Sequence, residues 1–336
     1  MAPKVLCTLG MFIIDQFEFR DASGQLTGRT QPEAIGGGGT YSVIGARIWL
    51  PATDLGMIVD RGNDFPLAIQ QQLSSFGNEM WLYRDRTDGN PTLRAINLYR
   101  GENNRGFAYL TSKIRIEPDQ FIGTQLARPK YLHFVCAPAR AAVVLAQVEE
   151  EEGWKPITVY EPIPSSCTPE ELPMLRPILH KIDILSPNAD EAFSLLAIPE
   201  PVTKAKVEMA ASALLDGVKK AVVIRSGAMG SYTLAVGADR GHWTPAFWTE
   251  NEAASKVVDV TGAGNMFLGG LVAGLEKTSG DIIEASLYAS VSASFAIEQA
   301  GLPSIAKPVV EGGPELWNGD DPHARLEIMR TRTVRP

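Results

Sequence analysis

The sequence predicts an α/β protein in which helices cover both faces of a parallel sheet, so that three layers form. From Tyr131 onward, short apolar segments alternate with longer helical ones. Such alternation builds βαβ units, because parallel strands are joined by helical crossovers. The expected elements of this region are strand 131–135, helix 139–150, strand 156–160, helix 169–180 and strand 182–185.

The segments on either side continue this layout. Before residue 131, the expected elements are a buried strand from Val5 to Ile14, a helix at 41–49, a strand at 56–60 and a helix at 66–76. After residue 185, they are helix 204–216, strand 221–225, a strand pair at 231–235 and 241–243, and helices 263–275 and 281–299.

Two further segments have the alternating pattern and the turn residues of β-hairpins. The first spans 17–33, and the second spans 92–109 with its turn at 101–104. We expect these hairpins to pair into a small separate sheet that forms a lid near 15–35 and 92–112.

The chain has no repeat, low-complexity tract or linker that would separate a second domain. We therefore expect one domain over residues 1–306. The remaining residues, 307–336, contain prolines, glycines and arginines, and we expect this tail to wrap the surface or fray.

Charge and cysteine content restrict the function classes. A net charge of -8 and an isoelectric point near 5.2 provide no basic field for a polyanion, so nucleic acid is not an expected partner. Cys7, Cys136 and Cys167 are odd in number and far apart, which argues against a disulfide framework and a zinc cluster.

No apolar stretch has the length of a membrane span. We expect a cytoplasmic protein that does not bind membranes.

The segment Val257 to Phe267 carries the strongest chemical signal. An apolar approach is followed by Gly262, Ala263, Gly264 and Asn265, and then by a helix of small and apolar residues. Glycines at a helix N-terminus allow backbone amides to converge on an anion such as phosphate. Close helix packing accounts equally well for glycines at this place.

Two other polar segments follow buried strands. Asn188 and Glu191 begin a helix after strand 182–185, and Arg225, Gly227 and Gly230 follow strand 221–225. Ligands collect at the carboxyl ends of strands in open α/β sheets. An ordinary capping box explains Asn188 and Glu191 without any ligand, and a tight turn beside a surface arginine explains the other segment.

Together, these segments resemble the ribokinase-like (PfkB) family of carbohydrate and nucleoside kinases. The resemblance covers roughly residues 5 to 303 and rests on six motifs in the family's order. These motifs are Asp15 at the end of a strand, Gly36 to Arg47, Gly62-Asn63-Asp64, Pro187-Asn188-x-x-Glu191, Gly227-x-x-Gly230, and Asp259-Val260-Thr261-Gly262-Ala263-Gly264-Asn265.

The resemblance implies phosphoryl transfer from ATP to a hydroxyl of a small sugar, nucleoside or similar alcohol, with Mg²⁺ and, as a further candidate, a monovalent cation. The amides of Gly262, Ala263 and Gly264 would form the anion hole. The acceptor pocket would be lined by Asp15, Gly37, Gly38, Thr40, Tyr41, Asp64, Arg94 and Asn97. The nucleotide would contact Asn188, Glu191, Arg225, Gly227 and Gly230, with Glu191 near the metal.

Two positions depart from the family pattern. In the diglycine segment, the family often has an asparagine that contacts the sugar, and this chain offers Thr40 or Tyr41 instead. The family carries its catalytic aspartate where this chain has Asn265, and an amide oxygen is too weakly basic to accept a proton at neutral pH. Asn265 can still hydrogen-bond an acceptor hydroxyl. Asp259 or a phosphate oxygen is then a candidate to assist proton removal.

Three functions remain open at this point. The first is a kinase weakened or re-tuned at its base. The second is an inactive member that binds nucleotide or sugar phosphate as a regulator or scaffold. The third is the same fold used for other chemistry, for which His133 and His180 are candidates, although a structural role explains both. The resemblance is compatible with a monomer or with a homodimer formed through the lid.

Overall fold

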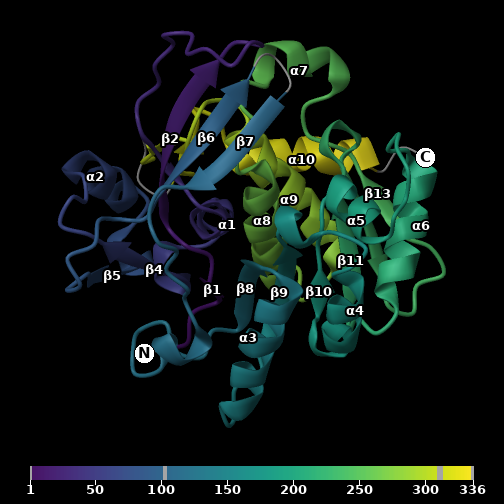
Figure 1. The fold of residues 1–336 in the computed structure, drawn as a ribbon. Helices are drawn as coiled ribbons and strands as arrows, with labels where there is room; N and C mark the ends of the chain where they lie inside the picture. Colours follow the sequence, from purple (N-terminus) through teal and green to yellow (C-terminus); the bar gives the residue numbers. More distant parts are fainter. Residues whose placement is uncertain (1, 101–103, 309–312, 334–336) are drawn as a thin grey trace.

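A nine-stranded sheet forms the centre of the protein, shown in Figure 1. The computed structural model describes residues 2–100, 104–308 and 313–333. The strand order is β13 (His242–Thr244), β12 (Ser231–Ala235), β11 (Ala221–Arg225), β10 (Ile184–Leu185), β9 (Ile157–Pro162), β8 (Tyr131–Cys136), β1 (Leu6–Thr8), β4 (Leu55–Arg61) and β5 (Trp81–Asp85). In this order, the strands from β11 across to β5 are parallel to one another, and β12 and β13 add an antiparallel edge.

Helices cover both faces of this sheet, which confirms the predicted three layers. One face is packed by α1 (Gly38–Arg47), α2 (Leu67–Ser75), α8 (Ala263–Lys277), α9 (Ile282–Ala296) and α10 (Pro322–Thr333). The other is packed by α3 (Pro138–Glu150), α4 (Leu172–Leu175), α5 (Ala189–Leu195) and α6 (Lys204–Leu215). None of the helices in the described part of the chain has both the length and the apolar character needed to cross a membrane.

The predicted N-terminal strand is in fact two strands in different sheets. The apolar run from Val5 to Ile14 contributes β1 to the central sheet and the start of β2 (Ile13–Arg20) to a second sheet. The chain bends at Gly10, whose amide donates to Thr8 Oγ1 at 3.0 Å. A side chain at Gly10 would meet the backbone of Gly39 at 2.5 Å, so the bend brings β1 directly against α1.

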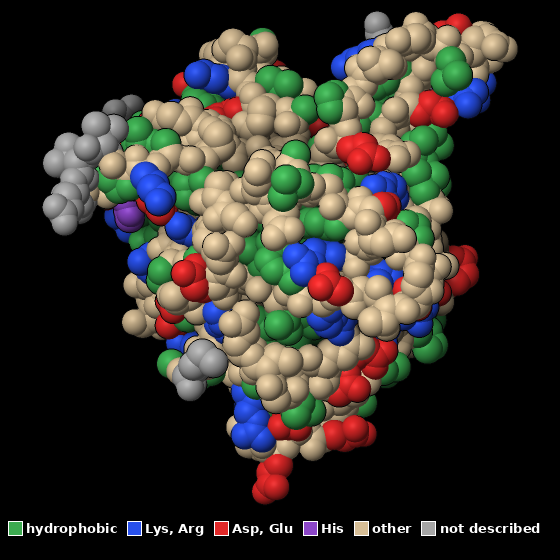
Figure 2. Space-filling model, turned by 90° about the vertical axis from the view of Figure 1, so that its left-hand side faces the viewer, with side chains coloured by type: hydrophobic (Ala, Val, Ile, Leu, Met, Phe, Trp, Pro, Cys, Tyr) green, Lys and Arg blue, Asp and Glu red, His purple; other side chains and the backbone are tan. Residues whose placement is uncertain are grey.

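The predicted lid is a four-stranded sheet with the order β3 (Ala34–Gly36), β2, β6 (Arg94–Arg100) and β7 (Asn104–Tyr109). The two segments pair as expected, through parallel pairing of β2 with β6. The turn predicted at 101–104 lies largely outside the described residues. The tip of the lid stands out from the body at the upper right of Figure 2, where small groups of hydrophobic side chains alternate with charged ones on the visible face.

Other elements differ from the prediction. Pro173 and Pro177 interrupt the helix expected at 169–180, which becomes α4 and a 3₁₀ helix at Arg176–Lys181. Strand β5 and the short helix α7 (Glu250–Lys256) were not predicted. The described part of the tail does not fray: α10 packs on α9, and β14 (Ile305–Ala306) pairs with β15 (Leu316–Trp317).

Helices α1 and α8 touch through glycine, and this contact places their N-termini side by side. A Cβ atom at Gly269 would lie 1.8 Å from the Ser42 carbonyl oxygen, and one at Gly45 would lie 2.2 Å from the Met266 carbonyl oxygen. Only glycine allows two helix backbones to approach so closely. The two helix N-termini that the sequence suggested as ligand sites therefore belong to one place.

We predict that Gly269→Ala lowers the free energy of unfolding by about 1–3 kcal/mol, because the added methyl group overpacks the contact between α1 and α8. Helix propensity alone predicts the opposite sign, since alanine is favoured over glycine by about 1 kcal/mol within a helix. Urea unfolding monitored by circular dichroism measures the difference. Ser212→Ala, on the exposed side of α6, is the control and should stay within about 0.5 kcal/mol of the wild type. A stabilised Gly269→Ala variant would contradict the close contact.

Candidate functional site

A cavity of about 1360 Å³ opens at the carboxyl ends of the parallel strands, between the lid and the N-terminus of α8. Its lining comes from the lid strands, from the start of α1, from the ends of β8, β9 and β11, and from the first turns of α5 and α8. This is where an open α/β sheet binds its ligands. Segments separated by more than 200 residues therefore contribute to one site.

The glycine segment at the start of α8 forms one wall. Gly262 is the N-cap and has a left-handed backbone with φ of 78°, which turns the chain into the helix. A Cβ atom there would lie 2.2 Å from the Tyr41 ring, so the ring packs flat against the glycine. A Cβ atom at Gly264 would lie 2.1 Å from Arg225 Nη1. The glycines thus let the N-terminus of α8 lie in the cavity wall beside a guanidinium group, which is a suitable site for an anion.

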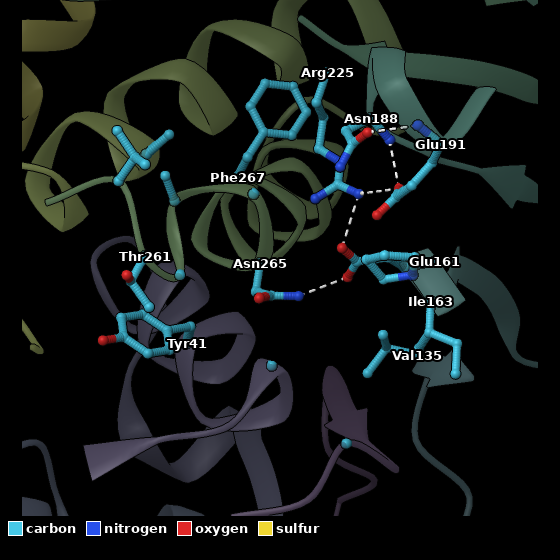
Figure 3. A pocket seen from close by; sticks show the side chains of 18 of the residues that line it. Tyr41, Val135, Glu161, Ile163, Asn188, Glu191, Arg225, Thr261, Asn265 and Phe267 are labelled. Atoms are coloured by element: carbon cyan, nitrogen blue, oxygen red, sulfur yellow. Dashed lines mark hydrogen bonds and ion pairs between the residues drawn. The ribbon is translucent and has the colours of Figure 1, made fainter. Parts of the chain in front are cut away.

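Arg225 is the centre of a buried charge cluster, shown in Figure 3. Its Nη2 atom lies 2.7 Å from Glu161 Oε1 and 3.5 Å from Glu191 Oε2, and it donates to the Ser186 carbonyl oxygen at 3.1 Å. Arg225 comes from β11, Glu161 from β9 and Glu191 from α5. Two carboxylates thus share one cation at the edge of the sheet.

The two carboxyl groups respond differently to this environment. Burial raises the pKa of Glu191 to about 7; the Arg225 guanidinium acts to lower this pKa, and the Glu161 charge acts to raise it. Burial also acts to raise the pKa of Glu161, but Arg225 and His133 together bring it below its ordinary value. At neutral pH, Glu161 is therefore ionised, while Glu191 is near its midpoint.

Asn188 and Glu191 form the capping box that the sequence suggested. Asn188 Oδ1 accepts from the Glu191 amide at 2.8 Å, and the Asn188 amide donates to Glu191 Oε2 at 2.7 Å. Both residues also line the cavity. The cap explains their local conformation and leaves Glu191 beside the anion site.

The other side of the cavity is formed by the lid and by the start of α1. Of the predicted acceptor residues, Asp15, Gly37, Gly38, Tyr41 and Asn97 line the cavity. Gly37 requires glycine because its φ is 93° and a Cβ atom would lie 2.1 Å from the Met11 carbonyl oxygen. Asp15 and Asn97 are buried polar side chains among apolar neighbours such as Met11 and Ile13.

Some predicted residues lie outside the cavity lining. Thr40 is buried within α1. Asp64 accepts from the Thr92 amide at 2.7 Å and pairs with Arg94, so the two predicted contacts satisfy each other. Asp259 Oδ1 accepts from the amide of Thr261 at 2.9 Å and from its hydroxyl at 2.6 Å, which shapes the loop before α8. Gly227 and Gly230 do line the cavity, beyond Arg225.

Sequence reasoning missed Glu161. Its Oε2 atom accepts a hydrogen bond of 2.6 Å from Asn265 Nδ2. The available signal was a lone charge at the carboxyl end of the apolar strand 157–162. Of the two candidate histidines, His133 is buried 3.8 Å from Glu161, whereas His180 is exposed on a 3₁₀ helix.

The residues present fit a nucleotide phosphate better than a metal centre built from protein groups alone. The described residues contain no group of three or more His, Cys, Asp or Glu side chains that could hold a metal ion. Mg²⁺ in phosphoryl-transfer sites is held mainly by waters and substrate phosphates, with one or two carboxylates. Glu191 is such a carboxylate, and the N-terminus of α8 beside Arg225 suits the phosphates.

The chain is similar to known proteins along almost its whole length. Residues 141–307 match the pfkB family of carbohydrate kinases. An uncharacterized protein of Schizosaccharomyces pombe is 34% identical over 339 residues, covering 95% of this chain and 91% of that protein. Protein MAK32 of Saccharomyces cerevisiae is 31% identical over 340 residues, covering 94% and 89%.

Solved structures show the same fold. Ribokinase of Arabidopsis thaliana, complexed with ribose and ATP, matches with a TM-score of 0.68 and 18% identity, covering 98% of this chain and 99% of that one. Ribokinase of Thermotoga maritima matches with a TM-score of 0.66, 18% identity and the same coverage. With the shared motifs, the fold and the matching relatives in place, the chain belongs to the ribokinase-like pfkB family of carbohydrate kinases.

Proposed function

We propose that the protein transfers a phosphoryl group from ATP to a hydroxyl group of a small sugar, nucleoside or similar alcohol. The observation that carries this proposal is the position of Asn265. It lines the cavity directly after the glycine segment, and in Figure 3 its side chain lies between Tyr41 and Glu161. A γ-phosphoryl group at the start of α8 and an acceptor under the lid would therefore meet at Asn265.

Catalysis in this arrangement is positioning and electrostatic stabilisation. The amides at the start of α8 and the Arg225 guanidinium would stabilise negative charge on the transferred group. Bound Mg²⁺ would neutralise phosphate charge, and Glu191 is the carboxylate placed to hold it. The lid would hold the acceptor hydroxyl in line with the phosphorus atom, which replaces a bimolecular encounter by a fixed approach.

The acceptor pocket supports a small, partly hydroxylated substrate. Asp15 and Asn97 offer polar atoms, whereas Met11, Ile13 and Phe107 offer apolar surface. A sugar or nucleoside presents both hydroxyl groups and apolar ring faces. The lining alone does not select one of these.

A second candidate function is favoured by one specific observation. Asn265 has no basic group of its own, so a member of this family could bind nucleotide or sugar phosphate without turning it over. The same glycine amides and Arg225 would serve this role. ATP consumption with Mg²⁺ and a panel of sugars and nucleosides separates the two functions.

Gly262→Ala tests the phosphate site. We predict that it weakens Mg·ATP binding and lowers phosphoryl transfer by about 10²-fold, because the added methyl group displaces Tyr41 and distorts the start of α8. Calorimetric titration measures the affinity, and ADP formation measures the transfer.

Gly153→Ala is the matched control, since Gly153 has the same φ of 78° but has open space around it. Gly153→Ala introduces the same backbone strain, which lowers the free energy of unfolding by about 1 kcal/mol. It should bind Mg·ATP as the wild type does. Equal binding by Gly262→Ala and the wild type would place the phosphate elsewhere.

The raised pKa of Glu191 predicts a pH-dependent stability. The folded protein keeps the Glu191 proton up to about pH 7, whereas the unfolded chain releases it near the ordinary value of 4.5. The protonated form is favoured by folding, so stability is lost as pH rises through this window.

Glu191→Gln keeps the capping box and removes the charge, so its stability should gain on the wild type between about pH 4.5 and 7. Urea unfolding at pH 5, 6, 7 and 8 without Mg²⁺ measures the difference between the two proteins. A difference that does not change with pH would show that Glu191 titrates normally.

A further inference from the structure

Glu161 places a carboxylate beside the reaction position, although position 265 has none. It lies near the end of β9, where the strand meets the cavity, and it is only 6% exposed. One oxygen, Oε1, pairs with Arg225 at 2.7 Å. The other, Oε2, faces Asn265 across the cavity wall, as Figure 3 shows.

The hydrogen bond from Asn265 to Glu161 fixes the orientation of the Asn265 amide. An ionised carboxylate can only accept, so the atom 2.6 Å from Oε2 must be the amide nitrogen. The Asn265 carbonyl oxygen is thereby left to accept from another group. Gly38 at the start of α1 packs against this amide, since a Cβ atom there would lie 3.0 Å from Nδ2. The amide is thus held from both sides.

The surroundings keep Glu161 able to accept a proton. Arg225 balances its charge, and His133 Nε2 lies 3.8 Å from Oε2. The His133 ring is fixed by Thr8 Oγ1, which lies 2.8 Å from Nδ1 and accepts from the Gly10 amide. This contact holds the ring with Nε2 toward Glu161. Each of these contacts favours the ionised carboxylate.

We propose that Glu161 is the proton acceptor for the substrate hydroxyl and that Asn265 is the positioning residue that orients this hydroxyl toward it. The inference rests on the proposed phosphoryl transfer. In the step, the acceptor O–H bond breaks and its proton moves to Glu161 Oε2, while the acceptor oxygen bonds to the γ-phosphorus. The bond from phosphorus to the β–γ bridging oxygen breaks, and its electron pair leaves with ADP. Glu161 then releases the proton to solvent.

In this assignment, the carboxylate that the family has at position 265 is replaced by Glu161, which is hydrogen-bonded to Asn265. A second lone pair on Oε2 remains for the substrate hydroxyl while the first accepts from Asn265. Neutralising Arg225 requires only Glu161 Oε1. The contact of Oε2 with Asn265 is not explained by that role. The same Arg225 nitrogen already contacts Glu191.

The test compares Glu161→Gln, Asn265→Asp and the double variant E161Q/N265D with the wild type. Phosphorylated product and ADP are measured with Mg·ATP and a panel of sugars and nucleosides, and Mg·ADP affinity is measured by calorimetry. We expect Glu161→Gln to lower transfer by ~10²–10⁴-fold while Mg·ADP affinity stays within about threefold. The double variant has the total charge of the wild type, and it should recover at least about tenfold of that loss because it restores a carboxylate to the site.

Glu298→Gln is the matched control. Glu298 and Arg325 form another buried ion pair, 2.6 Å apart, and neither residue lines the cavity. This variant should lose stability as Glu161→Gln does and keep the transfer rate. Should Glu161→Gln fail to fold, Glu161→Asp keeps the charge but withdraws the carboxylate from Asn265, and it should still lower transfer.

Three outcomes would overturn the inference, and they differ from one another. Transfer by Glu161→Gln within about threefold of the wild type would leave the kinase in place and remove Glu161 as its base. If the wild type forms no product and Asn265→Asp does, catalysis requires a carboxylate at position 265, and the wild-type protein is an inactive member of the family. If the wild type and all the variants bind nucleotide but consume no ATP, both the proposed phosphoryl transfer and the role of Glu161 in it are wrong.

Discussion

The site depends on the close contact between α1 and α8. Glycine at Gly45 and Gly269 lets the two backbones meet, and Gly10 brings β1 against Gly39 in the same way. A Cβ atom at any of these positions would lie 1.8–2.5 Å from a backbone atom of the neighbouring element, which is closer than van der Waals contact allows. The contact sets the distance between the starts of α1 and α8 in the cavity wall, and the proposed in-line transfer would depend on that distance.

A buried charge cluster then determines what the site can do chemically. Arg225, Glu161 and Glu191 come from three different elements, and each would be costly to bury alone. Their pairing leaves Glu161 ionised and Glu191 close to its midpoint. The cluster thus places a cation beside the start of α8 and an ionised carboxylate beside Asn265. Asn265 links the two through its hydrogen bond to Glu161.

Much of the fold could be predicted from the sequence because its signals are local. Apolar runs and helical segments alternate regularly from Tyr131 onward, and glycine and proline mark several boundaries. The split of the run Val5–Ile14 between two sheets could not be predicted, since periodicity within a short apolar segment does not reveal which sheet a strand joins. The helix α10 was missed because a charged segment packs on the domain through a few buried groups, among them Arg325.

The parts of the candidate site that lie within one sequence motif could be predicted, whereas the contacts between distant segments could not. The glycine segment at the start of α8 could be found from its own residues, whereas the pairing of Asp64 with Arg94 depends on two segments that are 30 residues apart. The link between Asn265 and Glu161 spans 104 residues. The sequence showed an amide at position 265, and only the fold shows the carboxylate beside it.

A structure of the protein with Mg²⁺, ADP and aluminium fluoride would test the central claim most directly. Aluminium fluoride mimics the phosphoryl group in transfer, with the attacking oxygen in the axial position. We expect the mimic to lie on the amides of Gly262 to Gly264, with the axial oxygen within hydrogen-bond distance of Glu161 Oε2. A mimic bound at these amides whose axial oxygen contacts Asn265 but not Glu161 would contradict it.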